Sequence, residues 1–168
     1  MPTFVRLKRE LLRRFSHSDH DGMLIVAFRR GTAKEALAKI EESLAAIRTC
    51  DPQRYLRLRR DLLFVVVARA PLRAFSRFTG TCTLPERTVV QRSAGVIAGM
   101  IVHVATQARF ARAGILALGP RAGRRAYVRC LREQIAFMEQ LARAGWSNTD
   151  GYVNWLRGVI ADAESGAA

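Results

Sequence analysis

One apolar segment, Ile101 to Arg109, has residues at the spacing of a metal-binding helix and reads IVHVATQAR. His103 and Gln107 are four residues apart, so on a helix their side chains lie on the same side. A hydrolytic metal site on one helix needs histidine at both of these positions, with a glutamate directly after the first histidine as the general base. This chain has Val104 in place of the glutamate and Gln107 in place of the second histidine. We therefore expect no intact catalytic residue in this segment.

Arginine dominates the charge of the chain. It has 28 lysines and arginines against 14 acids, a net charge of +14, and only three of the basic residues are lysines. Between Leu62 and Arg132 there are twelve arginines and a single acid, Glu86. Such a field attracts anions, whether nucleic acid, acidic lipid or an acidic protein, and opposes the binding of a dication. The favoured interpretation is nevertheless a solvated basic face produced by an arginine-rich coding bias.

The most regular basic group is a stripe at helical spacing in the last third of the chain. Its members are Arg121, Arg125, Arg129 and Arg132. On a helix they share one face, which predicts a basic surface for weak binding of nucleic acid or another anionic surface. No established nucleic-acid-binding motif accompanies the stripe.

The chain fits one domain covering residues 1–168, because 168 residues with 49% hydrophobic content can bury a core. Residues 1–22 form a basic N-terminal segment, and Met1–Phe15 is amphipathic. We expect this stretch to dock on its own domain, with an anionic membrane surface as the alternative. It lacks the pattern of a secretory signal, which predicts a cytoplasmic protein. The three widely spaced cysteines are expected to be reduced and mostly buried.

The first half of the chain begins with a polar stretch. His17–Gly22 reads HSDHDG and is expected to be a turn. A metal site made by His17, Asp19, His20 and Asp21 is the less favoured alternative. Met23–Phe28 is either a strand or a buried lead-in, since periodicity alone does not separate the two.

Two helices are predicted next. Thr32 and Glu35 form a capping-box pattern at the start of the first helix, which ends at Asp51-Pro52. Pro52–Arg60 is expected to be a short basic helix.

The second half contains the elements that would position the metal-type segment. Leu62–Ala68 and Phe75–Thr83 are predicted as two extended stretches. Gln91–Phe110 is predicted as the central helix, a second long helix runs from Gly119-Pro120 to about Ala144, and the last helix covers Asn148–Ala163.

The central helix is apolar but not long enough to span a membrane. Ser93–Ala108 has no charged residue apart from neutral His103, yet its 16 residues fall short of the roughly 20 that a bilayer requires. We therefore expect no transmembrane segment. Gly95 and Gly99 then indicate close packing of another backbone.

These elements together resemble a family of small bacterial zincin-like proteins of the gluzincin type, in which the motif reads like IVHEATHAR. The resemblance rests on the buried strand, the Thr81–Leu84 connection, the IVHVATQAR helix and the later CLREQIAF helix, and covers about Asp61 to Val159. It implies an α+β fold: a mostly helical single domain with a small antiparallel sheet packed on a central zincin-like helix. In that family an edge strand receives a peptide substrate by adding it to the sheet.

The resemblance also assigns a third metal ligand. In gluzincin-type peptidases this ligand is a glutamate some two dozen residues after the second histidine, and Glu133 matches that position. His103 and Glu133 would then be the remnant of a metal site. Because catalytic zinc has three protein ligands as a rule, we expect no tight zinc binding, no cofactor and no peptidase activity. We expect His103 to be a packed neutral residue, and Glu133 to pair with Arg129 or Arg109.

Two functions from different classes follow from the sequence. The first is a catalytically degenerate zincin-like protein, a pseudoenzyme that binds a peptide or protein partner in its cleft. The second is an arginine-rich module that binds nucleic acid or an anionic surface. An enzyme of unrelated chemistry is not indicated, since the chain has no recognised nucleophile, phosphate-loop or dinucleotide motif.

Overall fold

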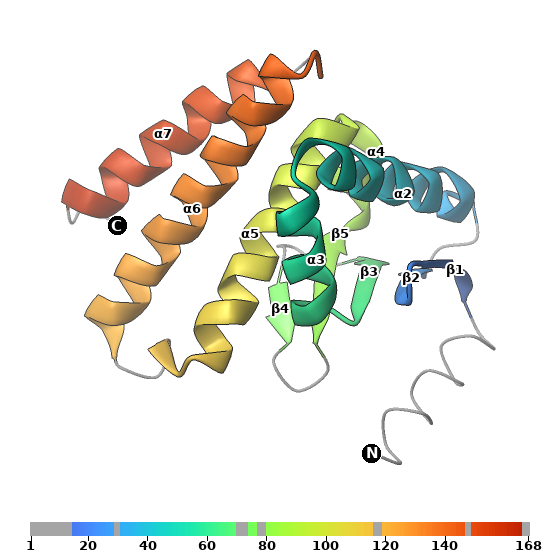
Figure 1. The fold of residues 1–168 in the computed structure, drawn as a ribbon, viewed down its shortest axis with the longest axis horizontal. Helices are drawn as coiled ribbons and strands as arrows, with labels where there is room; N and C mark the ends of the chain where they lie inside the picture. Colours follow the sequence, from blue (N-terminus) through green and yellow to red (C-terminus); the bar gives the residue numbers. More distant parts are fainter. Residues whose placement is uncertain are drawn as a thin grey trace.

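The computed structural model describes residues 15–28, 31–69, 74–76, 80–115, 119–146 and 149–165. Within these ranges the chain forms a mostly helical α+β domain, as predicted (Figure 1). The strands are β1 (Ser16–His20), β2 (Met23–Ala27), β3 (Phe64–Ala68), β4 (Ala74–Ser76) and β5 (Thr81–Pro85). The helices are α2 (Ala33–Cys50), α3 (Pro52–Asp61), α4 (Glu86–Gln91), α5 (Ala94–Arg112), α6 (Pro120–Arg143) and α7 (Asp150–Ser165). The predicted amphipathic helix of Met1–Phe15 lies outside the described residues, apart from Phe15.

The sheet is mixed, and the prediction of an antiparallel sheet was wrong at its centre. The strand order is β1-β2-β3-β5-β4, and β3 pairs in parallel with both β2 and β5. Only the two edges, β1 with β2 and β4 with β5, are antiparallel. The parallel pairing of β2 with β3 follows from their connection, since α2 and α3 lie between them and carry the chain back to the same end of the sheet. The parallel pairing of β3 with β5 follows from β4, which lies between them in the chain and runs antiparallel to β5.

Alternation along the strands gives the sheet two apolar faces. Residues such as Ile25, Val65 and Leu84 join the main core with α2, α5 and α6. Leu24, Val26, Phe64 and Val66 form a second buried cluster on the opposite face. Strands β2 and β3 are therefore buried on both faces, which suits their apolar, largely β-branched composition.

The polar stretch predicted as a turn is the first strand and its hairpin. Ser16–His20 pairs with Met23–Ala27. Asp21 and Gly22 make the turn, with φ of 52° and 83°. Positive φ at both central residues is typical of the two-residue turn that connects a twisted hairpin, and Asp-Gly is one of its preferred sequences. Part of the predicted N-terminal segment therefore belongs to the sheet.

Other predicted boundaries needed smaller corrections. Phe75–Thr83 contains parts of two strands, β4 and β5. The predicted central helix is divided, because α4 ends at Gln91 and α5 begins at Ala94, where the Ser93 hydroxyl accepts a hydrogen bond from the amide of Val96. The capping box at the start of α2 does not form: the Thr32 hydroxyl donates to Glu86.

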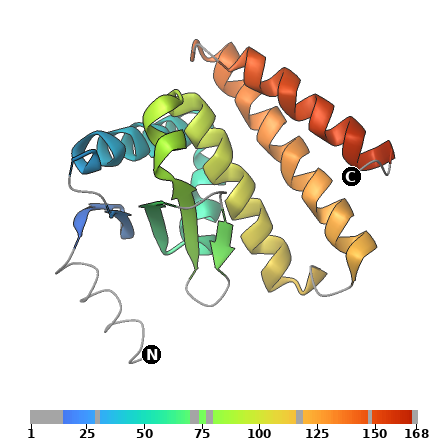
Figure 2. The ribbon, with the colours of Figure 1, turned by 180° about the vertical axis from the view of Figure 1, so that it is seen from behind.

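The α5 helix lies between the sheet and the pair formed by α6 and α7 (Figures 1 and 2). Close approach of α5 to α6 depends on Gly99, where an added Cβ would lie 2.7 Å from the Sδ atom of Met138. The predicted tight packing at Gly95 and Gly99 is confirmed, but the nearest atoms belong to side chains and not to another backbone. By length and composition α5 is the one helix in the described ranges that could cross a membrane, and 78% of that stretch is buried inside the protein.

Candidate functional site

The metal-type segment is in the core of the protein. Val104 is fully buried and His103 is 3% exposed, whereas Gln107 is half-buried. The His103 ring lies edge-on to the Tyr127 ring of α6, with centroids 5.8 Å apart. His103 is therefore packed as predicted, and Val104, where the resemblance would require a general base, is a core side chain.

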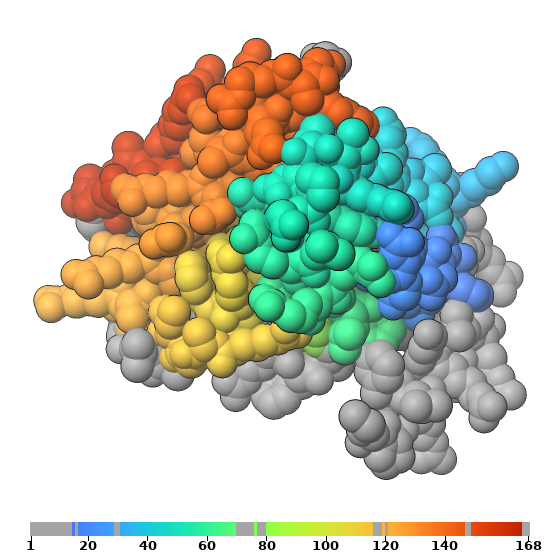
Figure 3. Space-filling view, in the orientation of Figure 1, coloured from blue at the N-terminus to red at the C-terminus, as the bar shows by residue number. Residues whose placement is uncertain are grey.

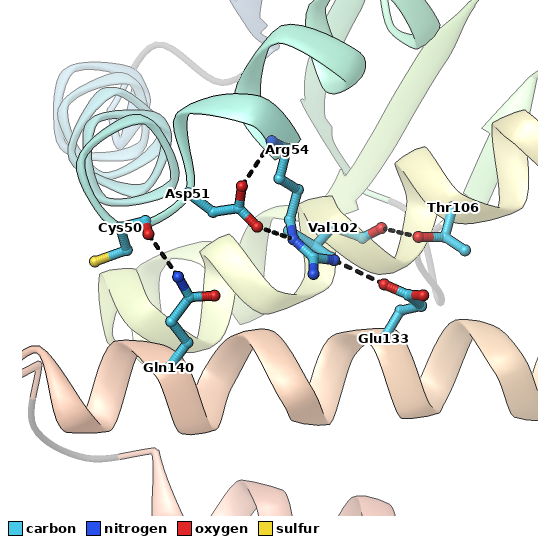
Figure 4. Close-up of polar contacts among 7 residues, drawn as sticks. All are labelled: Cys50, Asp51, Arg54, Val102, Thr106, Glu133 and Gln140. Carbon is cyan, nitrogen blue, oxygen red and sulfur yellow. Dashed lines mark hydrogen bonds and ion pairs between the residues drawn. The ribbon is translucent and has the colours of Figure 1, made fainter.

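Glu133 is paired with an arginine, but not with either predicted partner. Its Oε2 atom accepts a hydrogen bond from Nη1 of Arg54 at 3.0 Å, which joins α6 to α3 (Figure 4). Their side chains are 29% and 18% exposed, so the pair is partly shielded from water. The prediction that Glu133 pairs with an arginine is confirmed, but the predicted partners Arg129 and Arg109 were wrong: the partner is Arg54.

Arg54 is held from its other side by Asp51. The Asp51 carboxylate accepts from Nε of Arg54 at 2.9 Å and from the Arg54 backbone amide at 2.8 Å, where it caps α3. One guanidinium therefore bridges two carboxylates (Figure 4). Nearby, Nε2 of Gln140 donates to the Cys50 carbonyl at 2.6 Å and ties α6 to the end of α2. The bridge fixes the distance between α6 and the junction of α2 with α3.

His103 does not lie on the side of α5 that faces Glu133. Glu133 lines a pocket with Val102, Thr106 and Arg109, whereas His103 follows Val102 and is about 100° further around the helix. The structure contains no group of three or more His, Cys, Asp or Glu side chains that could hold a metal ion within its described ranges. The absence of tight zinc binding remains a prediction.

The pocket beside Glu133 is small, with a volume of about 30 Å³. It lies between α3, α5 and α6, which meet on one face of the molecule (Figure 3). The residues around it are Arg54, Arg57, Leu58, Asp61, Val102, Ala105, Thr106, Arg109 and Glu133. It therefore combines guanidinium groups with an apolar wall.

The arginine stripe is exposed on α6, as predicted. Arg121, Arg125, Arg129 and Arg132 are all exposed. Several of them border a groove of about 420 Å³ between α6 and α7, together with Arg124, Val128, Ala163 and Glu164. Arg132 forms an ion pair with Glu164 of α7. Arg121, Arg125 and Arg129 form no ion pair with any residue in the described part of the chain.

The polar hairpin does not assemble a metal site. Asp21 accepts a hydrogen bond from the Tyr55 hydroxyl at 2.9 Å and pairs with Arg48. The hydrogen bond from Tyr55 and the nearby positive charges lower the pKa of Asp21. Burial, followed by the bond to Asp21, raises the pKa of Tyr55 to about 12. His17 and Asp19 are exposed and alternate along β1 with half-buried His20, so these candidates do not converge.

The bridging roles of Asp51 and Arg54 were not predicted from the sequence. A local signal existed, because Asp51-Pro52 followed by Arg54 is an aspartate helix cap with a proline at the first helical position. No local signal indicates that Arg54 also reaches Glu133, which is 79 residues away.

Compared with protein-family models, curated proteins and solved structures, the chain gives no match.

Proposed function

We propose that this protein is a non-catalytic binding module, a degenerate relative of zincin-type peptidases, and that its arginine face on α6 binds an acidic segment of a partner protein. The observation that carries the proposal is the groove between α6 and α7, bordered by Arg124, Arg125, Arg129 and Arg132. A concentrated row of guanidinium groups on a rigid helix suits recognition of carboxylates.

Loss of catalysis is supported by the surroundings of the motif. Val104 is buried among apolar side chains, so this position offers no base to activate a water molecule. Glu133 is engaged by Arg54, and a guanidinium beside a carboxylate competes with a cation for it. Both positions have taken structural roles, which favours binding over hydrolysis.

An acidic protein segment fits the groove better than a phosphate backbone. Val128 and Ala163, both buried residues, form an apolar part of the groove lining. An apolar lining suits contact with the side chains of a peptide. A carboxylate, that of Glu164, already pairs with Arg132 at one end. From Arg121 to Arg132 the stripe extends over about 16 Å of helix, enough for roughly three turns of an acidic helix laid against it.

Nucleic acid is the second candidate. It is favoured by three guanidinium groups that form no ion pair with described residues, those of Arg121, Arg125 and Arg129. A phosphate would not have to displace a carboxylate from them, as it would at Arg132, which pairs with Glu164. Phosphate contacts would make affinity fall steeply with salt, by about one unit of log-log slope per neutralised phosphate.

The experiment compares two probes and two variants. A fluorescent glutamate-rich peptide and a single-stranded DNA oligonucleotide of equal charge are titrated at several salt concentrations. The stripe variant Arg125→Gln/Arg129→Gln is compared with Arg87→Gln/Arg143→Gln, which removes the same charge from exposed positions outside the groove. We expect peptide affinity to fall about tenfold in the stripe variant, and much less in the control.

Equal losses in the two variants would mean that net charge alone attracts the peptide, and would contradict a specific site. Tighter, steeply salt-dependent binding of the oligonucleotide, lost in the stripe variant alone, would instead assign the surface to nucleic acid.

A further inference from the structure

The pocket between α3, α5 and α6 is separate from the arginine stripe, and its charge is not balanced. Both acids in its wall are engaged. Glu133 is paired with Arg54, and Asp61 accepts from Nη1 of Arg112 at 2.8 Å. No acid in the wall is therefore left without a guanidinium.

Two arginines of the wall have no such partner. Arg57 and Arg109 form no ion pair with a residue in the ranges that the structure describes. The guanidinium of Arg109 lies over the neighbouring Phe110 ring, 5.7 Å from its centroid, a contact that leaves its N–H groups available in its own plane. The charge balance is taken over the charged residues that line the pocket and the charged residues that form ion pairs with them. This set has five arginines and three acids, an excess of 5 − 3 = +2. The arginines are Arg54, Arg57, Arg60, Arg109 and Arg112, and the acids are Asp51, Asp61 and Glu133.

The rest of the wall favours a strong interaction with an anion. Leu58, Val102 and Ala105 are buried apolar residues, and they lower the local dielectric beside the charges. The Thr106 hydroxyl donates to the Val102 carbonyl at 2.9 Å, so it is already committed (Figure 4). The donors available to a guest are therefore guanidinium N–H groups.

The size of the pocket limits the guest. A volume of about 30 Å³ corresponds to roughly two positions the size of a water oxygen. This accommodates a small group of oxygens, with the remainder of a ligand outside the pocket. Planar guanidinium groups bind carboxylate and phosphate oxygens in this way, often through two parallel hydrogen bonds.

We propose that this pocket binds a small oxyanion group, a carboxylate or a phosphate, between Arg57 and Arg109, while Arg54 is held in the wall by Asp51 and Glu133. The site is independent of the groove between α6 and α7.

Arginine side-chain resonances test this directly. The ¹⁵N-labelled full chain is titrated with inorganic phosphate and, separately, with acetate, at constant ionic strength set by sodium chloride. We expect saturable shifts of a few Nε–Hε signals. Arg57→Gln should weaken the binding about tenfold, and Arg57→Lys should weaken it less. Arg143→Gln, at an exposed position that lines neither the pocket nor the groove, should leave it unchanged.

Arg57 is exposed, so its replacement should leave the fold intact, and a thermal melt of each variant checks this. Tighter binding of phosphate indicates a phosphorylated ligand, and tighter binding of acetate a carboxylate ligand. Shifts that never saturate, or an equal loss in Arg143→Gln, would overturn the proposal.

Discussion

Arg54 and Glu133 are 79 residues apart in the chain, and their side chains meet at 3.0 Å, from Nη1 to Oε2. The contact connects the first turn of α3 to the middle of α6. It occupies the carboxylate that the zincin-like resemblance assigns to a metal. The pair therefore has a structural effect that can be measured.

Glu133→Gln removes the charge and keeps the shape of the side chain. We expect a loss of about 1 kcal/mol in the free energy of unfolding, because the pair is partly shielded from water and Arg54 would keep only its contact with Asp51. Glu139→Gln is the matched control, since Glu139 also lies on α6 and its partner Arg157 is 58% exposed. Its loss should stay below about 0.5 kcal/mol. Urea unfolding of both variants measures the difference, and equal losses would contradict the role of shielding.

Metal content tests the degenerate motif. We expect protein purified without a metal-affinity tag to contain no stoichiometric zinc by elemental mass spectrometry, and its melting temperature to be insensitive to chelators. Restoring Val104→Glu and Gln107→His together should create zinc binding. Stoichiometric zinc in the wild type, or a folded double variant that takes up none, would contradict the geometry implied by the resemblance.

The structure adds an expectation for that double variant. Position 104 is fully buried, so a glutamate there places a carboxylate in the core and should cost about 3 kcal/mol or more without metal. Zinc should recover part of this loss, because a ligand that binds only the folded state stabilises it. Melting temperatures with and without zinc provide the measurement.

Gly99 tests the contact between α5 and α6. In Gly99→Ala the new Cβ would lie 2.7 Å from Sδ and 2.8 Å from Cγ of Met138, so that side chain must move within a packed core. We expect a loss of about 1 to 3 kcal/mol. Gly123→Ala is the control: it lies in α6 with no atom within 4 Å of the new Cβ, and should gain about 0.5 to 1 kcal/mol from helix propensity. Stabilisation by both substitutions would contradict the close packing at Gly99.

Gln134 is a buried amide at the same helix interface. It is fully buried in α6, and neither its Oε1 nor its Nε2 has a hydrogen-bond partner among the described residues. Gln134→Met keeps the length of the side chain and removes both polar atoms, so we expect stabilisation by about 1 to 3 kcal/mol. Chemical unfolding measures it, with Gln140→Met as a control that should destabilise, since Gln140 donates to the Cys50 carbonyl. A loss in Gln134→Met would show that the amide is satisfied in solution.

Tyr55 predicts a stability change at high pH. Its pKa is raised to about 12 in the folded protein, from an ordinary value of 10.0. The folded state therefore holds this proton more tightly than the unfolded state does, so its contribution to stability is complete below pH 10 and is lost as the pH rises to about 12. Tyrosinate absorbance should show one late transition near pH 12 that disappears in Tyr55→Phe. A titration that this substitution leaves unchanged would contradict the prediction.

Most helices could be predicted because their apolar positions recur with helical period. Helix α6 begins at Pro120 and ends at Arg143, close to its predicted limits. The β1–β2 hairpin was missed because its outer strand is polar, although Asp21-Gly22 is a recognised turn signal. The parallel centre of the sheet could not be predicted from the strands, since the direction of pairing depends on where α2, α3 and β4 return the chain.

The site was predictable only in part. The exposed stripe on α6 and the buried His103 follow from spacing and composition. The bridge from Asp51 through Arg54 to Glu133 does not, because three elements must first fold and pack before the guanidinium can reach the second carboxylate. The Thr32 and Glu35 pattern shows the same limit: tertiary structure gave the Thr32 hydroxyl a different partner, Glu86.

Asp51 is both the C-terminal cap of α2 and the N-terminal cap of α3. Its backbone amide donates to the Ile47 carbonyl at the end of α2, and its carboxylate caps α3 while it holds Arg54. One residue therefore contacts the end of α2 through its backbone, and the start of α3 and Arg54 through its side chain. In homologous chains we expect substitutions at positions 51, 54 and 133 to occur together. Losing Arg54 would leave two carboxylates without a guanidinium, and losing Asp51 or Glu133 would remove one of the two acids that hold Arg54.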